Sequence, residues 1–263
     1  GVAAQGVSAF PREVTAQMVA NFRNGGAAIN ALSRACGAEL EIVDLALDQP
    51  TADITQAPAM DEAECLEAIN AGAATVPRDA DLFFVGEMGI ANTTPAAALS
   101  ACCFGGDAMD WVGRGSGIDD AALARKIKAV NSALAKHASY CDSPFETLRR
   151  LGGREIAAMA GAILASRMQH IPMLLDGFIC CAAIAPLAAA APAITHHCLA
   201  AHCSAEGAHS RLLEHLGLDP LLHLEMRLGE GSGAAVAVQI VRSALAAHNE
   251  MATFTEASVA SAL

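Results

Sequence analysis

Short, almost continuous apolar runs alternate along the chain with longer stretches in which apolar residues recur every three or four positions. Runs that are apolar throughout are typical of strands covered on both faces, whereas the second pattern is typical of helices. Strands alternating with helices predict βαβ units, and therefore a three-layer α/β fold with a mostly parallel sheet flanked by helices. We predict strands in the four apolar runs, at residues 40–47, 81–86, 171–177 and 193–201.

Helix start signals precede the periodic stretches. A proline suits the first helical turn, and acids there face the positive end of the helix dipole. Asp119 is a candidate N-cap for the longest of these stretches. The predicted helices span residues 11–21, 61–71, 119–137, 153–168 and 233–249.

Composition and net charge exclude several kinds of partner for this protein. The 263 residues are 54% hydrophobic and carry a formal net charge of −12. We therefore expect no nucleic acid and no anionic membrane as partner, because both attract basic surfaces. The nine cysteines form no C-x-x-C pair and lie mostly among alanines, as expected of buried thiols in a reducing compartment.

No run of apolar residues has the length of a membrane span without interruption. Residues 178–194 come closest, but two prolines break the run, so we predict a buried helix there. We expect a cytoplasmic protein. The opening residues resemble the inside of a loop and lack a starting Met, so we also expect an incomplete chain.

Three glycine-rich loops carry the candidate chemistry, at residues 86–94, 113–120 and 227–234. Glycines let the backbone approach a ligand, and NH groups at a helix start or in a nest suit an anion. The third loop fits G-x-G-x-x-A, but an Ala-rich helix follows it rather than a strand with an acid, so we reject a dinucleotide site. The chain also lacks a Walker-type phosphate loop.

Two of these loops place an acid between glycines, namely Glu87 and Glu230. A carboxylate enclosed by glycines and apolar residues is partly desolvated, which raises its pKa toward the range of a general base. A structural acceptor of backbone NH groups explains each acid equally well. The pattern alone leaves both interpretations open.

Histidines between residues 196 and 210 suggest a metal site at first sight. His197 and His202 fit a zinc spacing loosely. However, His196 and His197 fall in a predicted strand, where neighbouring side chains face opposite ways. We therefore predict core or loop histidines and no metal.

The loops closely resemble those of the nicotinate-nucleotide–dimethylbenzimidazole phosphoribosyltransferases. The matching blocks run in the family's order along nearly the whole chain: GVSAFPREVTAQMVANF, GEMGIANTTPAAAL, VGRGSGIDDAALARK, LGGREIAAMAGAI, IPMLLDGFI, HCSAEGAH, MRLGEGSGAA and NEMATF. The resemblance implies transfer of 5-phosphoribosyl from nicotinate mononucleotide to 5,6-dimethylbenzimidazole, with inversion at C1′. The implied products are α-ribazole 5′-phosphate and nicotinate, and no cofactor is needed.

The family's architecture implies a large α/β catalytic core at residues 26–233. Residues 1–25 and 234–263 would supply terminal helices to a small helical subdomain, and the family usually forms a homodimer. Two rival functions fit the same loops: a non-catalytic nucleotide-binding protein and a nucleoside phosphorylase. Retention of the acids argues against the first rival, since pure binding needs no base.

Residue roles follow from the resemblance position by position. Glu230 matches the family's catalytic base, while Glu87 and Lys126 match two further positions implicated in function. The loops around residues 92–94 and 114–117 would hold the nucleotide phosphate, and Glu87 would face the reacting ribose and base. The implied substrate-binding residues are Met88, Gly89, Asn92, Thr93, Thr94, Arg114, Gly115, Ser116, Gly117, Asp176, Ser204, Arg227, Leu228 and Gly229.

Overall fold

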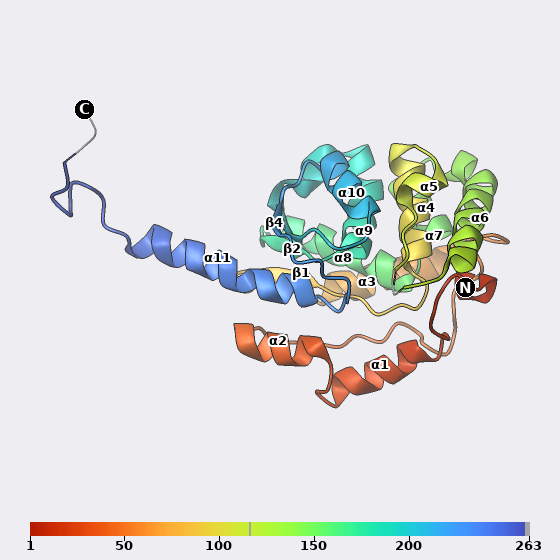
Figure 1. Ribbon diagram of the computed structural model, residues 1–263, viewed down its shortest axis with the longest axis horizontal. Coiled ribbons are helices and arrows are strands. Elements are labelled where there is room, and N and C mark those ends of the chain that lie inside the picture. The colour runs from red at the N-terminus through yellow and green to blue at the C-terminus, as the bar shows by residue number, and fades with distance from the viewer. Residues whose placement is uncertain (116, 261–263) are drawn as a thin grey trace.

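Four parallel strands form a sheet in the order β1-β2-β3-β4 (Figure 1). In the register of the sheet, Phe83 lies opposite Met173, which lies opposite Cys198. Ala200 lies opposite Pro220. Parallel pairing brings the carboxyl ends of all four strands to one edge, and the predicted α/β class is confirmed. The strands are β1 (Phe83–Val85), β2 (Met173–Leu175), β3 (Cys198–His202) and β4 (Pro220–Leu222).

Helices flank this sheet in the computed structural model, which describes residues 1–115 and 117–260. The α-helices are α1 (Val14–Arg23), α2 (Ala28–Cys36), α3 (Glu62–Ala74), α4 (Thr93–Phe104), α5 (Ala108–Trp111), α6 (Asp120–His137), α7 (Pro144–Leu151), α8 (Arg154–Met168), α9 (Phe178–Ala190), α10 (Ala208–Leu216) and α11 (Ser232–Glu250). Three 3₁₀ turns complete the described elements: η1 (Val2–Gln5), η2 (Ala138–Tyr140) and η3 (Pro192–His197).

The two faces of the sheet are covered by different parts of the chain. Met173 and Leu175 belong to the larger core, which includes side chains of α4, α7, α8 and α9. Leu174, between them, belongs to a second core that it shares with α2 and α11. Successive side chains of a strand face opposite sides, so a strand with two covered faces must be apolar throughout. This explains the uninterrupted apolar run that predicted β2.

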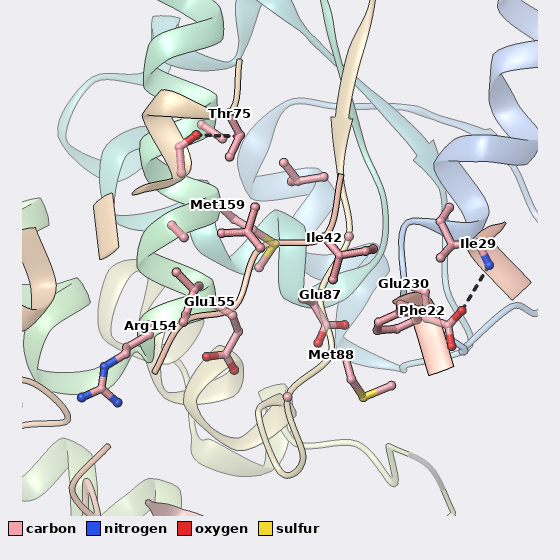
Figure 2. Close-up of a pocket in the computed structure, with 18 of the residues that line it drawn as sticks. Phe22, Ile29, Ile42, Thr75, Glu87, Met88, Arg154, Glu155, Met159 and Glu230 are labelled. Atoms are coloured by element: carbon pink, nitrogen blue, oxygen red, sulfur yellow. Dashed lines mark hydrogen bonds between the residues drawn. The ribbon is translucent and has the colours of Figure 1, made fainter. Parts of the chain in front are cut away.

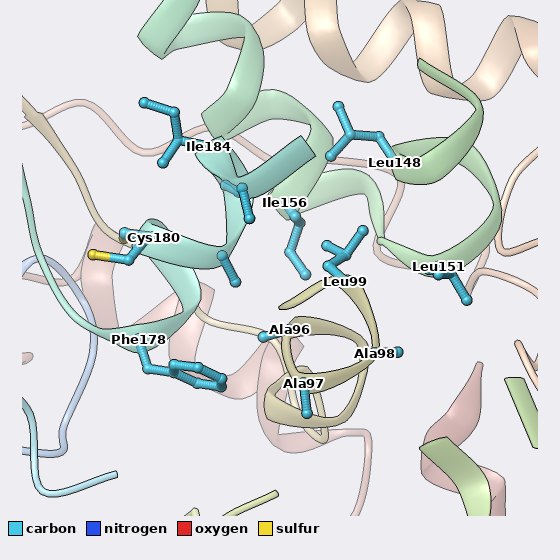
Figure 3. Close-up of a cluster of buried hydrophobic side chains, with 14 of the residues drawn as sticks. Ala96, Ala97, Ala98, Leu99, Leu148, Leu151, Ile156, Phe178, Cys180 and Ile184 are labelled. Carbon is cyan, nitrogen blue, oxygen red and sulfur yellow. The ribbon is translucent and has the colours of Figure 1, made fainter. Parts of the chain in front are cut away.

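Helix α4 lies inside the larger core. Ala96, Ala97, Ala98 and Leu99 are fully buried, and Figure 3 shows them beside side chains of α7, α8 and α9. Small side chains on every side of a helix let its neighbours approach closely, and close packing leaves little spare volume. The start of α4 is therefore held rigidly, which matters because the first glycine-rich loop leads into it.

Helices α3 and α8 cross in backbone contact. A Cβ atom on Gly72 would lie 1.8 Å from the carbonyl oxygen of Ala158, and one on Gly161 would lie 1.9 Å from that of Ile69. No side chain fits at either position without moving a helix. The crossing fixes α8, and with it the residues at the start of α8.

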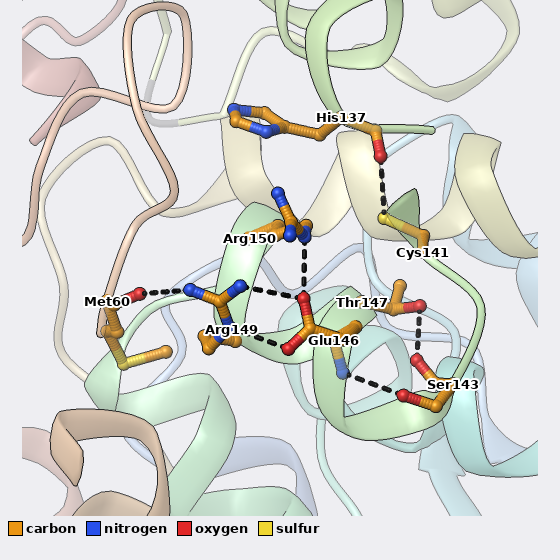
Figure 4. A network of polar contacts seen from close by, with 8 residues as sticks. All are labelled: Met60, His137, Cys141, Ser143, Glu146, Thr147, Arg149 and Arg150. Carbon is orange, nitrogen blue, oxygen red and sulfur yellow. Dashed lines mark hydrogen bonds and ion pairs between the residues drawn. The ribbon is translucent and has the colours of Figure 1, made fainter. Parts of the chain in front are cut away.

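A polar cluster anchors α7 (Figure 4). Ser143 caps this helix by accepting from the Glu146 NH at 3.2 Å. The Glu146 carboxylate accepts from Arg149 at 2.8 and 2.7 Å and from Arg150 at 2.7 Å. The hydrogen bonds from Arg149 and Arg150, together with the charges of both guanidinium groups, lower the pKa of Glu146 to about 2, although burial opposes the decrease. Arg149 also reaches the carbonyl of Met60 at 3.4 Å, which ties the loop before α3 to α7.

Two strand predictions are wrong in whole or in part. Residues 40–47 follow an irregular path, because only Ile42 packs on the second core while Val43 and Leu47 stay exposed. The start of the run 193–201 forms η3, in which His197 bonds the carbonyls of Ile194 and Ile163 at 3.0 and 3.1 Å. Strand β3 begins only after it.

The predicted helices are all present, with ends shifted by a few residues. The buried helix predicted at residues 178–194 is present as α9 but ends at Ala190, and Pro192–His197 form η3. Within residues 1–115 and 117–260, every helix is too short or too polar to cross a membrane. The division into a core at residues 26–233 and terminal helices stays a prediction. Figure 1 shows the outer part of α11 extending away from the body, and its residues from 239 to 250 are almost all exposed.

Candidate active site

A cavity of about 1870 Å³ opens beside β1 and the start of α8 (Figure 2). Its lining combines carboxylates with apolar side chains, as is usual for sites that take small aromatic molecules. The carboxylates that matter below are Glu87, Glu155 and Glu230, and the apolar side chains drawn around them include Phe22, Ile29, Ile42, Met88 and Met159.

Glu87 follows β1 at the carboxyl edge of the sheet. Its Oε2 atom accepts a hydrogen bond of 2.5 Å from the Asn92 amide. Burial raises the pKa of Glu87 to about 7, with further increases from the charges of Glu155 and Asp176, while the Asn92 amide opposes the rise. This carboxyl group can therefore hold or release a proton near neutral pH.

Glu230 enters the cavity from the loop before α11. Its side chain is 7% exposed, and its Oε2 accepts from the backbone NH of Ile29 at 3.3 Å, at the start of α2. Burial raises the pKa of Glu230, and the NH groups of Ile29 and Ala28 oppose the rise. Glu230 also has a φ of 65°, a strained value for a residue with a side chain. Strain of this kind persists only where the surrounding structure enforces it.

The two acidic loops touch backbone to backbone. The NH of Glu230 donates to the carbonyl of Glu87 at 3.2 Å. A Cβ atom on Gly86 would lie 2.2 Å from the carbonyl carbon of Glu230. Only glycine fits at position 86, which explains why the acid of the first loop follows a glycine. The separation of the two acids is therefore set by main-chain contacts and not by flexible side chains.

Lys126 is the centre of a second polar cluster, which also contains Thr93 at the start of α4, Gly113 and Glu206. Its Nζ donates to Thr93 Oγ1 and to the carbonyl of Gly113, both at 2.8 Å, and its side chain is 1% exposed. Burial lowers the pKa of Lys126 to about 8, although the nearby Glu206 carboxylate opposes the decrease. Among the described residues, Glu206 Oε2 is buried without a hydrogen-bond partner. A cation, a helix start and glycine-rich backbone meet here, a combination suited to an anion.

Asp176 and Ser204 follow β2 and β3 and are not among the residues that line the cavity. Asp176 Oδ1 accepts from the Ala234 NH at 2.8 Å, in the first turn of α11, and lies 3.6 Å from His202 Nε2. Ser204 Oγ lies 2.9 Å from His209 Nδ1, and burial lowers the pKa of His209 to about 3. These buried groups hold the strand ends and the start of α11 in place.

Several predicted site residues lie apart from the cavity. Arg114 turns outward, pairing with Asp120 at 2.5 Å and donating to the Ile118 carbonyl at 2.9 Å. Thr94 is fully buried, while Arg227 and Leu228 are exposed. Asn92 occupies the N-cap position of α4 without a capping side-chain hydrogen bond, and its amide donates to Glu87 instead.

The remaining predicted positions divide into three groups. Met88, Gly89 and Asn92 line the cavity with the two acids, and a Cβ on Gly229 would lie 2.8 Å from Glu87 Oε1. Gly115 lies in the loop beside Lys126, and Gly117 follows it with a φ of 104°. Ser116 lies outside the described residues.

Comparison with known proteins gives the family. A family model described as phosphoribosyltransferase matches residues 1–259. The chain belongs to this phosphoribosyltransferase family. It is 63% identical over 263 residues to the nicotinate-nucleotide–dimethylbenzimidazole phosphoribosyltransferase of Novosphingobium aromaticivorans, covering 100% of this chain and 78% of that protein. It is 60% identical over 260 residues to the protein of the same name from Roseobacter denitrificans, covering 99% and 77%.

The fold of this phosphoribosyltransferase also matches a solved structure. CobT from Thermus thermophilus superposes with a TM-score of 0.90 at 40% sequence identity, over 100% of this chain and 84% of that one. A second structure from the same organism, titled as the nicotinate-nucleotide–dimethylbenzimidazole enzyme, gives 0.89 at 39%. The sheet and helices described above are thus those of the phosphoribosyltransferase fold.

Two carboxylates of this phosphoribosyltransferase were not predicted from the sequence. Glu155 lines the cavity, and Glu206 faces Lys126. A signal for Glu155 is present in the sequence, since Gly152 and Gly153 precede it much as glycines flank the other two acids. Glu206 follows β3 in a polar loop, and its partner lies far away in the sequence on α6, so no local pattern identifies it.

Proposed function

We propose that the chain transfers 5-phosphoribosyl from nicotinate mononucleotide to 5,6-dimethylbenzimidazole, releasing nicotinate and α-ribazole 5′-phosphate in cobalamin biosynthesis. The observation that carries the proposal is the Glu230 carboxylate, buried at the wall of an apolar cavity and held beside Glu87 by main-chain contacts. A desolvated carboxylate is a suitable acceptor for the proton that a benzimidazole must lose. The names of the relatives at 60–63% identity support the same reaction.

The chemistry follows from the charges of the reactants. The bond between nicotinate nitrogen and C1′ breaks, and its electron pair neutralises the pyridinium. Positive charge then develops on the ribose, where the nearby carboxylates stabilise it. A benzimidazole nitrogen attacks C1′ from the opposite face, so the anomeric centre changes from β to α. Glu230 takes the proton from the other ring nitrogen, and holding both rings in line supplies much of the acceleration.

The phosphate of the nucleotide is best accommodated at the centre around Lys126. The Lys126 Nζ atom donates a hydrogen bond to Thr93 at the start of α4, and Thr93 follows Asn92 in the sequence. We assign Thr93, Gly115 and Lys126 to phosphate binding. Arg114 would have to leave Asp120 to take part.

The proposal is tested by offering nicotinate mononucleotide and 5,6-dimethylbenzimidazole and following nicotinate release. Glu230→Gln removes the base and keeps the side-chain shape, so we expect kcat to fall by roughly 10²–10⁴-fold, the usual contribution of general base catalysis. The matched control is Glu225→Gln, an exposed acid of the same loop, which should leave kcat unchanged.

Two results would contradict the assignment. Full turnover by Glu230→Gln would show that another group takes the proton. Cleavage of a nucleoside that requires inorganic phosphate in place of the benzimidazole would instead identify a nucleoside phosphorylase.

We also propose a homodimer located in the cytoplasm. The outer half of α11 carries exposed apolar side chains, including Ile240 and Leu245, which a second copy could cover. Nine free cysteines are compatible with a reducing compartment.

A further inference from the structure

Glu155 lines the cavity together with Glu87 and Glu230. It is the second residue of α8, which the crossing with α3 holds in place. Figure 2 shows its side chain directed toward the same space as that of Glu87. The charge of Glu155 raises the pKa of Glu87, so the two carboxylates lie within electrostatic range of each other.

The Asn92 amide lies beside both acids. If Gly89 carried a Cβ, that atom would lie 2.2 Å from Glu155 Oε1 and 2.7 Å from Asn92 Nδ2, so both groups occupy the same side of Gly89. The Asn92 amide has two hydrogens. One is donated to Glu87 at 2.5 Å, and the amide also opposes the rise that burial causes in the pKa of Glu155. Asn92 thus lies next to both carboxylates.

The proximity of Glu87 and Glu155 is not explained by an ion pair with a neighbouring cation. Arg154, next in sequence, also lines the cavity, but its side chain extends away from Glu87 (Figure 2) and its guanidinium pairs with Glu64 on α3. Within the described part of the chain, neither Glu87 nor Glu155 forms an ion pair, and burial raises the pKa of Glu155 although the charge of Arg154 opposes the rise. Two half-buried carboxylates without a cation destabilise a fold. Such pairs are typical of functional sites.

We propose that Glu155 is a positioning residue of the active site: through the Asn92 amide that it shares with Glu87, it fixes the Glu87 carboxyl group toward the ribose. Without Glu155, the amide loses one of its two acceptors and is free to rotate away from Glu87. A displacement of about 1 Å in a group that faces the reacting atoms reduces turnover by roughly 10²-fold. The inference rests on the proposed phosphoribosyl transfer.

A double-mutant cycle tests this role. Glu155→Ala and Asn92→Ala should each lower kcat by roughly 10- to 100-fold, with a smaller effect on KM, because a mispositioned Glu87 affects the transition state more than substrate binding. The double variant should be no slower than the slower single variant, since both changes break one bridge. Glu155→Gln keeps an oxygen acceptor for Asn92 and should retain most of kcat.

Three results would overturn the proposal. Multiplicative losses in the double variant would show that the two residues act independently. A Glu155→Gln variant as slow as Glu155→Ala would show that charge matters and the shared hydrogen bond does not. An unchanged kcat in Glu155→Ala would show that Glu155 does not position Glu87.

Controls separate this inference from loss of structure and from failure of the proposed function. Turnover by the unaltered chain must be present first, because its absence contradicts the reaction itself and not the role of Glu155. Thermal unfolding of each variant shows whether it folds. Glu67→Gln changes an exposed carboxylate of α3 that lies outside the cavity, so it should leave kcat and KM unchanged.

Discussion

Glu87 and Glu230 differ in how the protein holds them. Glu230 accepts NH groups at the start of α2, which favour its charged form. Burial raises the pKa of Glu87 to about 7, and two neighbouring carboxylates add to the rise while the Asn92 amide opposes it. This difference suits separate roles, with Glu230 ready to accept a proton and Glu87 changing charge near neutral pH.

The raised pKa of Glu87 predicts a stability effect that depends on pH. Its folded pKa of about 7 exceeds the ordinary value of 4.5, so the folded chain keeps a proton that the unfolded chain loses between these values. The stability linked to this proton is fully present below pH 4.5 and is lost as pH rises through 7. Glu87→Gln cannot ionise, and we expect it to raise Tm relative to the unaltered chain at pH 8 more than at pH 4.5.

Calorimetry at the two pH values measures the effect, with the exposed Glu67→Gln as a control that should shift Tm equally at both. An equal shift for Glu87→Gln at both values would show that its carboxyl group is not desolvated in the fold.

Sequence predicted the individual acids only where a local pattern marks them. Glu87 and Glu230 stand between glycines, and the glycines are there because the two loops touch along the main chain. Glu206 and Lys126 meet through tertiary packing alone. The outward turn of Arg114 was also beyond prediction, because it depends on Asp120 being available at the start of the following helix.

Among the elements, the crossing of α3 and α8 connects packing to the site. Both helices have glycine at the contact. The crossing orients the first turn of α8, which contains Glu155. A change at the crossing should therefore affect both stability and turnover.

Gly161→Ala tests the crossing. The added methyl would lie 1.9 Å from the Ile69 carbonyl oxygen, so the helices must separate. We expect a loss of about 1–3 kcal/mol in the free energy of unfolding, the usual cost of overpacking, measured by urea denaturation. Gly207→Ala is the matched control, because open space surrounds that position in a helical backbone, and it should not destabilise the chain. Equal effects at both positions would contradict the tight crossing.

Elements were predicted well where burial on two faces or a clear helix start marks them, as in β2 and α6. The strand predicted at residues 40–47 is absent, because an apolar run does not indicate whether a neighbouring strand is available for pairing. Strand β4 was missed because it is short, begins at Pro220 and is only partly buried. Its position depends on pairing with β3.

At the scale of the whole molecule, the exposed half of α11 leads us to expect a homodimer. Leu245 is 53% exposed on a helix that extends beyond the body, and burying such side chains between two copies would stabilise a dimer. Sedimentation equilibrium should therefore show a dimer for the unaltered chain. Leu245→Lys should shift the equilibrium to monomer, whereas His248→Lys, at an exposed polar position of the same helix, should not. A monomer at all concentrations would refute the assembly.

The covering of the sheet's second face by α2 and α11 has a consequence for synthesis on the ribosome. The chain emerges from α1 toward α11, and the strands with the helices between them can assemble while α11 is still being added. Until it arrives, Leu174 and Ala201 lack half of their covering and Glu230 is not in place. A chain that terminates early would be inactive and would also expose apolar surface, so quality-control proteases could recognise it before any substrate is bound.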